Sequence, residues 1–186
     1  SAVPPIPPPL VNGVAGSQST YGEELVVSGI KDRVSYSIGQ FHFQTDGFRE
    51  NNDQRLGVVD AFVQAFLSPR TSVLAEFRAF DIDKGDLELR FLPGDYFGNL
   101  RVSEEYRGGR IGLHHAFSPG SDLIGTLVYE VRKNNNQLTD RIPFPDPPPG
   151  FILETNVEDR TEDHVVDVEL QQILRRERYQ LVAGAG

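Results

Sequence analysis

The chain has 186 residues and a mass of 20.7 kDa, with 18 Lys and Arg against 27 Asp and Glu, a net charge of −9, and no Cys, Met or Trp. This length suits one domain. The acidic balance excludes nucleic acid as a partner, because binding that polyanion relies on a basic surface. The absence of Cys excludes disulfides, thiol nucleophiles and Cys-ligated zinc, and fits either a reducing cytosol or an envelope protein.

Membrane helices are excluded because no stretch reaches the roughly 18 uninterrupted apolar residues that a helical span needs. The same test leaves β-barrel spans open, since barrel strands of about 9–11 residues alternate apolar and polar side chains. A mean hydropathy of −0.35 therefore does not separate a soluble protein from a membrane barrel.

Residues 1–9 are rich in proline, which predicts a linker or tether in extended polyproline geometry. From residue 10 to residue 186 the apolar residues recur with period two, which predicts a single β-domain. Residues 163–178 have a helix-like composition, but the β-branched Val165, Val166 and Val168 favour a strand. The predicted strands are residues 10–17, 23–30, 33–45, 55–67, 71–82, 109–117, 121–132, 163–174 and 178–186.

The lengths of the connections alternate along the chain. Short turns are predicted near residues 31–33, 68–70, 118–120 and 175–177, and long segments at residues 46–54, 83–108 and 133–162. In an up-and-down antiparallel sheet every second connection lies at the same end, so the short turns would form one rim and the long loops the other. Outer-membrane barrels have this asymmetry, whereas Greek-key sandwiches mix the lengths.

Charge follows the same division in the sequence. The long segments hold many carboxylates, including Asp83, Glu105 and Glu162, while Lys31 and Arg70 lie at short turns. The sequence therefore predicts an acidic loop end and a basic turn end, although solvated loops are commonly charged in any case.

Each predicted strand has one apolar and one mixed face. On residues 55–67, for example, Val59, Ala61, Val63 and Ala65 oppose Asp60 and Gln64. A membrane barrel would turn the apolar faces to lipid and the ionised ones to a water-filled lumen, where they avoid the cost of a dry core. The predicted pore-lining residues are Asp60, Gln64, Glu76, Arg78, Arg110, His114, Glu130, Asp167 and Glu169.

A soluble extracellular β-sandwich remains the alternative, with the same apolar faces packed as its core and its acidic loops contacting a partner. Tyr36, Tyr129, Phe41 and Phe80 near strand ends suit the aromatic girdle of a barrel, but Phe is common in soluble cores too. His115 on the apolar face counts against the barrel.

The sequence offers no strong catalytic or metal-binding motif. His114 and His115, near Ser118 and Asp122, resemble parts of a hydrolase or metal site, but adjacent residues of a strand point to opposite faces. No calcium-loop motif and no nucleotide-binding glycine loop is present. We therefore expect no enzyme activity, no metal and no cofactor.

A family resemblance supports the barrel. The stretch from Val27 to Asp53, the runs Ala61-Phe-Val-Gln-Ala-Phe-Leu-Ser-Pro69 and Gly85-Asp-Leu-Glu-Leu-Arg-Phe91, and the run His114 to Gly125 resemble the barrel region of large bacterial outer-membrane proteins that carry tetratricopeptide repeats upstream. The resemblance implies that Thr45-Asp-Gly-Phe-Arg49 begins an outer loop and that the Ser-Pro turns face the periplasm.

The resemblance also implies an outer-membrane location, lipid as the surrounding partner, and a pore or export channel for small polar solutes or polymer. Nine predicted strands are an odd number, whereas single-chain bacterial barrels have an even one. We therefore expect one of three arrangements: a barrel truncated at its C-terminus after an upstream repeat domain, eight strands that close alone, or a homo-oligomer that shares one pore.

Overall fold

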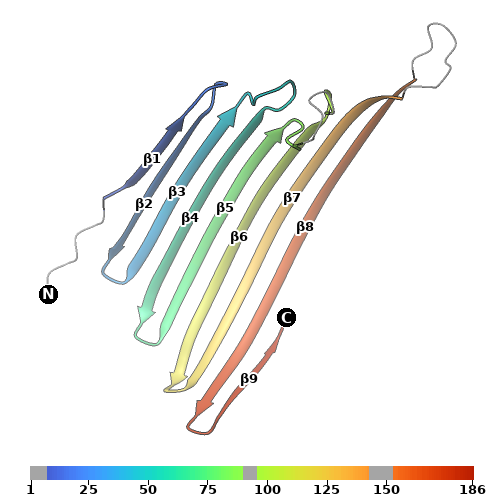
Figure 1. Ribbon diagram of the computed structural model, residues 1–186. Helices are drawn as coiled ribbons and strands as arrows, with labels where there is room; N and C mark the ends of the chain where they lie inside the picture. The colour runs from blue at the N-terminus through green and yellow to red at the C-terminus, as the bar shows by residue number, and fades with distance from the viewer. Residues whose placement is uncertain (1–7, 90–95, 143–152) are drawn as a thin grey trace, which may run out of the picture.

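The computed structural model describes residues 8–89, 96–142 and 153–186, which form nine β-strands. The strands lie in a single sheet in chain order, and each pairs antiparallel with the next (Figure 1). All nine predicted strands are confirmed, including the one with the helix-like composition. The strands are β1 (Leu10–Ala15), β2 (Tyr21–Lys31), β3 (Val34–Thr45), β4 (Gln54–Ser68), β5 (Thr71–Lys84), β6 (Arg101–Ser118), β7 (Ser121–Ile142), β8 (Leu153–Arg176) and β9 (Tyr179–Ala185).

The predicted alternation of connection lengths is confirmed in space. The turns at 32–33, 69–70, 119–120 and 177–178 lie at one end of the sheet, which we call the turn end (Figure 1). The connections at 16–20, 46–53 and 85–100 lie at the opposite end, the loop end. No helix in the described parts of the chain is long and apolar enough to cross a membrane.

Neighbouring hairpins are fixed to one another at the turn end. The backbone N–H of Phe66 donates to the carbonyl of Arg33 at 2.8 Å, and the N–H of Ala116 donates to the carbonyl of Arg70 at 2.8 Å. A β-bulge follows each donor, between Phe66 and Ser68 and between Ala116 and Ser118. The bulges insert one residue before each Ser-Pro turn and strengthen the local twist.

The strands are staggered, and the stagger can be measured along one row of paired residues. This row runs across the sheet through Gly39, Asp60, Arg78, Gly108, Glu130 and Val165. The distance from this row to the turn end is five residues on β3 (39 minus 34) and eleven residues on β8 (176 minus 165). It therefore grows by six residues over five strand steps. With a rise of about 3.4 Å per residue and about 4.8 Å between strands, the line through the turns departs by about 40° from the perpendicular to the strands.

Three strands reach further toward the loop end than the sequence predicts. β6 begins at Arg101 instead of residue 109, β7 continues to Ile142 instead of residue 132, and β8 begins at Leu153 instead of residue 163. Their outer parts carry polar residues on both faces, so the apolar alternation that marks a strand is missing there. Asp83, Glu105 and Glu162, expected in long loops, lie instead in the parts of the strands nearest the loop end.

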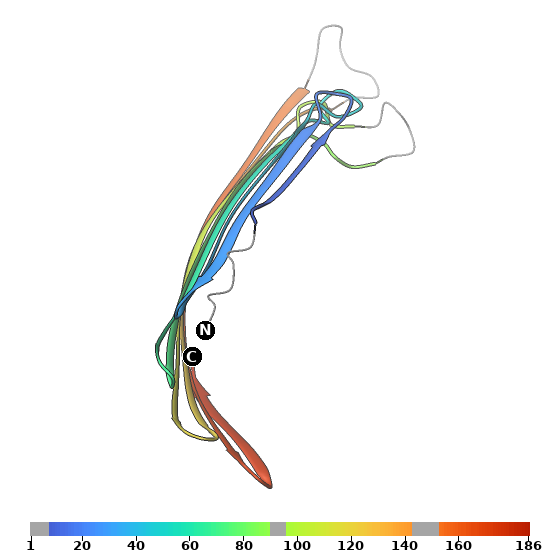
Figure 2. The ribbon, with the colours of Figure 1, turned by 90° about the vertical axis from the view of Figure 1, so that its left-hand side faces the viewer.

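The sheet is a single open layer. β1 and β9 are its edges and do not pair with each other, and edge-on it is one curved layer in the described residues (Figure 2). No described apolar side chain is buried, so the sandwich core of the alternative interpretation is not formed. The accessible surface is 13342 Å², whereas a compact monomer of this mass exposes roughly 9,000 Å². The excess belongs to faces that nothing in the structure covers.

Candidate functional site

The strand register divides the side chains of the sheet into two faces. Asp60 lies opposite Arg78, Glu76 lies opposite Arg110, and Thr126 lies opposite Glu169. Because side chains alternate along each strand, these pairings place all nine predicted pore-lining residues on one face, which we call the polar face. The register thus unites residues from five strands, β4 to β8, that are far apart in the sequence.

The opposite face carries an apolar belt near the turn end. Its members pair with one another across the sheet: Val63 with Ala75, Ala75 with Ile111, Ile111 with Leu127, and Leu127 with Val168. These side chains are open to the surroundings, and Val168, for example, is 57% exposed. The main members are Val59, Ala61, Val63, Ala65, Val73, Ala75, Phe77, Ala79, Ile111, Leu113, Leu123, Leu127, Tyr129, Val131, Val166, Val168 and Leu170.

The aromatic girdle inferred from sequence is corrected in part. Tyr36 and Tyr129 lie on the same face as the belt, as the register of β3 and β7 requires. Phe41 pairs with Val58 and Phe80 with Tyr106, and both pairs lie on the polar face. Nearness to a strand end does not determine the face of a residue, since one position of register reverses it.

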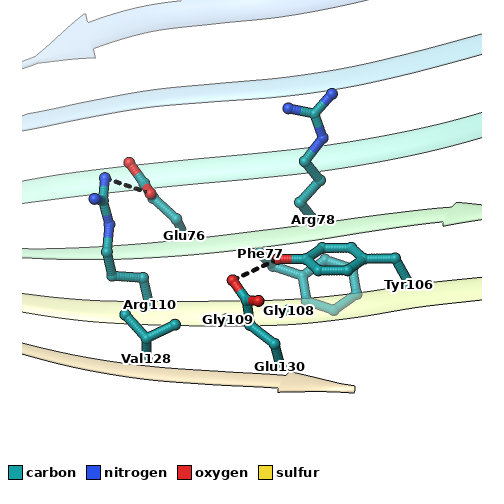
Figure 3. A pocket seen from close by; sticks show the side chains of 9 residues that line it. All are labelled: Glu76, Phe77, Arg78, Tyr106, Gly108, Gly109, Arg110, Val128 and Glu130. Carbon is teal, nitrogen blue, oxygen red and sulfur yellow. Dashed lines mark hydrogen bonds and ion pairs between the residues drawn. The ribbon is translucent and has the colours of Figure 1, made fainter. Parts of the chain in front are cut away.

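At the centre of the polar face an ion pair bridges β5 and β6. The Nη2 atom of Arg110 lies 2.6 Å from Oε2 of Glu76, and Figure 3 shows the two side chains pointing toward each other. One row away, Asp60 and Arg78 occupy directly opposed positions on β4 and β5. Glu76, Arg78 and Arg110 line an open hollow of about 290 Å³, together with Tyr106, Gly108 and Glu130 (Figure 3).

Tyr106 lies flat against the sheet next to this ion pair. Its hydroxyl donates to Oε1 of Glu130 at 2.9 Å, and its ring stacks on Phe80 with centroids 5.1 Å apart. The ring covers Gly108, where a Cβ atom would lie 2.2 Å from the tyrosine oxygen. Gly108 is therefore required for this position of the ring, and Tyr106 in turn orients Glu130.

The two histidines that suggested chemistry make separate contacts on opposite faces. His114 Nε2 lies 2.9 Å from Oδ1 of Asp122 on the polar face, and Arg175 contacts the other carboxylate oxygen of Asp122 at 3.1 Å. His115 Nδ1 lies 2.9 Å from Oγ1 of Thr71 on the belt side, which provides its ring with a polar partner at the turn end. The two contacts do not join into a chain of nucleophile, base and acid.

Beyond the apolar belt, toward the loop end, the face that carries the belt becomes charged. Arg107 pairs with Asp81 at 2.8 Å, Lys133 with Glu162 at 3.4 Å, and Arg160 with Glu158 at 2.9 Å, while Arg101 pairs with Asp83. We call this zone the charged collar. Its side chains of both signs are largely exposed, as expected for strands in contact with water on this face.

A buried carboxylate joins two connections at the loop end. Asp86 is 1% exposed, and its oxygens accept hydrogen bonds from the N–H of Glu88 at 3.0 Å and of Phe97 at 2.8 Å. Arg49 lies 3.7 Å from the Asp86 carboxylate and donates to the backbone carbonyl of Asp86 at 2.9 Å. Asn52 donates to that same carbonyl, so residues 46–53 are joined to residues 85–89 and 96–100 in what we call the loop clamp.

Arg101 attaches the loop clamp to the charged collar. Its guanidinium donates to both carboxylate oxygens of Asp53, at 2.7 and 2.9 Å, and also pairs with Asp83. The hydrogen bond from Arg101 lowers the pKa of Asp53 below its usual value, and the same contact raises the pKa of Arg101. The family resemblance implies that an outer loop begins at Thr45–Arg49, but nothing in the sequence indicates that Asp86 is the centre of the clamp.

Comparison with known proteins adds no function to this geometry. No protein-family model and no curated protein matches the chain. Within the residues that the structure describes, no group of three His, Cys, Asp or Glu side chains is placed to hold a metal ion. The site is therefore characterised by its own chemistry: an apolar belt on one face and a charged, open face behind it.

Proposed function

We propose that the sheet is the wall of an outer-membrane β-barrel that acts as a pore or export channel for small polar solutes or polymer. The observation that carries the proposal is the apolar belt, which lies exposed on one face while charged residues occupy the other at the same height. A single layer with such a face is not stable in water, since a sheet must bury its apolar side. Lipid would cover the belt without burying the polar face.

The dimensions of the belt and the stagger of the strands support a membrane location. On β7 the belt runs from Leu123 to Val131, eight residue steps, or about 27 Å along the strand. At the tilt of about 40° given by the stagger, this span corresponds to a height of about 21 Å, against the apolar band of about 25 Å in outer-membrane barrels. The tilt itself lies within the usual range of about 35–45°.

The directions of the two edge strands limit how the wall can close. β1 and β9 both run toward the loop end, so a ring of copies joined from β9 to β1 would contain parallel pairs. Antiparallel closure instead requires an odd number of further strands, which gives the even total of bacterial barrels. In the described residues β9 covers β8 only from Leu170 to Arg176, which leaves the rest of that edge of β8 unpaired.

Bilayer recording and site-specific probes test this proposal. The chain has no Cys, so a single cysteine can carry a fluorescent probe. In lipid vesicles, a probe at Val63→Cys should be quenched by a quencher in the lipid phase, whereas a probe at the neighbouring Gln64→Cys should be quenched from water. The unlabelled protein should give stepwise ion conductance in planar bilayers. A monodisperse monomer in plain buffer, with neither conductance nor lipid quenching, would overturn the proposal.

A further inference from the structure

The two faces of the sheet differ in charge as well as in hydropathy. At the height of the apolar belt the polar face carries five carboxylates and two guanidinium groups. The carboxylates belong to Asp60, Glu76, Glu130, Asp167 and Glu169, and the guanidinium groups to Arg78 and Arg110. This face therefore carries an excess of three negative charges (five minus two) when all seven groups are ionised.

The excess is not shared by the opposite face. The four ion pairs of the charged collar join four carboxylates to four cationic side chains, and Glu105 of the same face lies opposite Lys133. On the polar face at belt height, Glu76 and Arg110 form an ion pair, and Arg78 lies opposite Asp60. Glu130 is held by the Tyr106 hydroxyl, and Asp167 and Glu169 stand exposed on β8 without a cationic residue opposite them on β7.

We infer that this wall makes the pore selective for cations. The inference rests on the proposed function, since it requires water on the polar face. Fixed carboxylates along an aqueous lumen attract cations and repel anions, and rings of Asp and Glu have this role in cation channels. Their field extends over the Debye length, about 10 Å in 0.1 M salt, which reaches well into a narrow lumen. The preferred solutes are therefore small cations and positively charged molecules.

The test measures the permeability ratio of K⁺ to Cl⁻ from the reversal potential across a bilayer with a KCl gradient. At about 0.1 M salt the ratio should exceed one, and in 1 M KCl it should approach one because the Debye length falls to about 3 Å. The double variant Asp167→Asn, Glu169→Gln removes two negative charges from the polar face and should shift the ratio toward one. The matched control Glu105→Gln, Glu158→Gln removes two from the collar side and should leave it nearly unchanged.

Each outcome of this experiment has a distinct meaning. A conducting protein with a ratio of one or below at low salt would overturn cation selectivity and leave the pore in place. Equal shifts in the two double variants would also overturn the inference, because they would show that the net charge of the protein, and not the polar face, sets selectivity. A protein that inserts and never conducts would overturn the proposed pore, and the selectivity with it.

Discussion

The part of the sheet near the turn end and the part near the loop end consist of the same strands but differ in the side chains on the face that carries the belt. On β5 the belt residues Val73 to Ala79 alternate with Glu76 and Arg78, whereas further along the same strand Asp81 and Asp83 occupy the positions that continue the belt. The backbone pairing continues through this change without a break. Strand pairing therefore continues whichever side chains this face carries, and only the side chains mark where the apolar belt ends.

The two parts also differ in what fixes their side chains. At the loop end, the buried Asp86 and the Arg101 cluster hold residues 46–53 against residues 85–89 and 96–100 through hydrogen bonds and ion pairs. At belt height no described apolar side chain is buried, and each belt residue contacts only its neighbours on the sheet. The loop end thus carries its own stabilising contacts, while the belt depends on what covers it.

The largest expected effect comes from placing a charge in the belt. Ala75→Arg should destabilise the protein in lipid by about 2–4 kcal/mol, the range found for Arg near the middle of a bilayer. Ser103→Arg introduces the same side chain on the same face but in the charged collar, where surface substitutions change stability by about 0.5 kcal/mol or less. The free energy of unfolding from lipid vesicles, measured by urea titration, compares the two variants.

Equal losses from Ala75→Arg and Ser103→Arg would break the distinction between belt and collar. A small effect of Ala75→Arg in detergent-free buffer, together with a folded monomer, would show that water covers this face. Either result would remove the main support for a membrane wall.

The sequence predicted the sheet near the turn end better than near the loop end, for a physical reason. Around Val63 and Ala75 one face of the sheet carries apolar side chains and the other polar ones, so alternation reveals both the strand and its faces. Around Asn135 and Arg160 both faces are polar, and the strands are specified by pairing among β6, β7 and β8. Local pattern carries little information about such pairing, and the expected strands ended too early there.

The role of Asp86 was hidden from sequence for a related reason. Its partner Arg49 lies 37 residues away along the chain, in the connection before β4, and the pairing of β4 with β5 brings the two connections together. Gly47 and Asn51 adopt positive φ angles of 74° and 52°, and glycine and asparagine at these positions are signals of tight turns. Those signals predict where the chain reverses, but not which carboxylate the reversal will bury.

The second prediction concerns the loop clamp. Asp86→Asn removes the negative charge beside Arg49 and replaces one acceptor oxygen with a donor that faces a backbone N–H. A buried hydrogen-bonding group left unsatisfied costs about 1–3 kcal/mol, so the clamp should open more often. Hydrogen exchange of the Phe97 amide should quicken, while amides of β4 and β5 at belt height should keep their protection.

Asp81→Asn is the matched control for this variant, because Asp81 forms an exposed ion pair with Arg107 in the charged collar. Exposed pairs contribute about 0–1 kcal/mol, so exchange at Phe97 should stay near the wild-type rate. Equal acceleration in both variants would show that the loop clamp is no more tightly built than the collar beneath it.

The smallest expected effect is a pH dependence confined to the loop end. The pKa of Asp53 is lowered by the hydrogen bond from Arg101, so the folded clamp favours the ionised carboxylate. The stabilisation is present in full above the unfolded-state pKa of about 3.9 and is lost as the pH falls through the lower folded-state pKa. Between pH 5 and pH 3 the wild-type clamp should become more open to proteolysis. The Arg101→Gln variant should show a smaller increase in proteolysis over the same interval, because it lacks the favourable contact already at pH 5. A ¹³C titration can measure the pKa of the Asp53 carboxyl group in both proteins. The same pKa in the wild type and in Arg101→Gln would contradict this assignment.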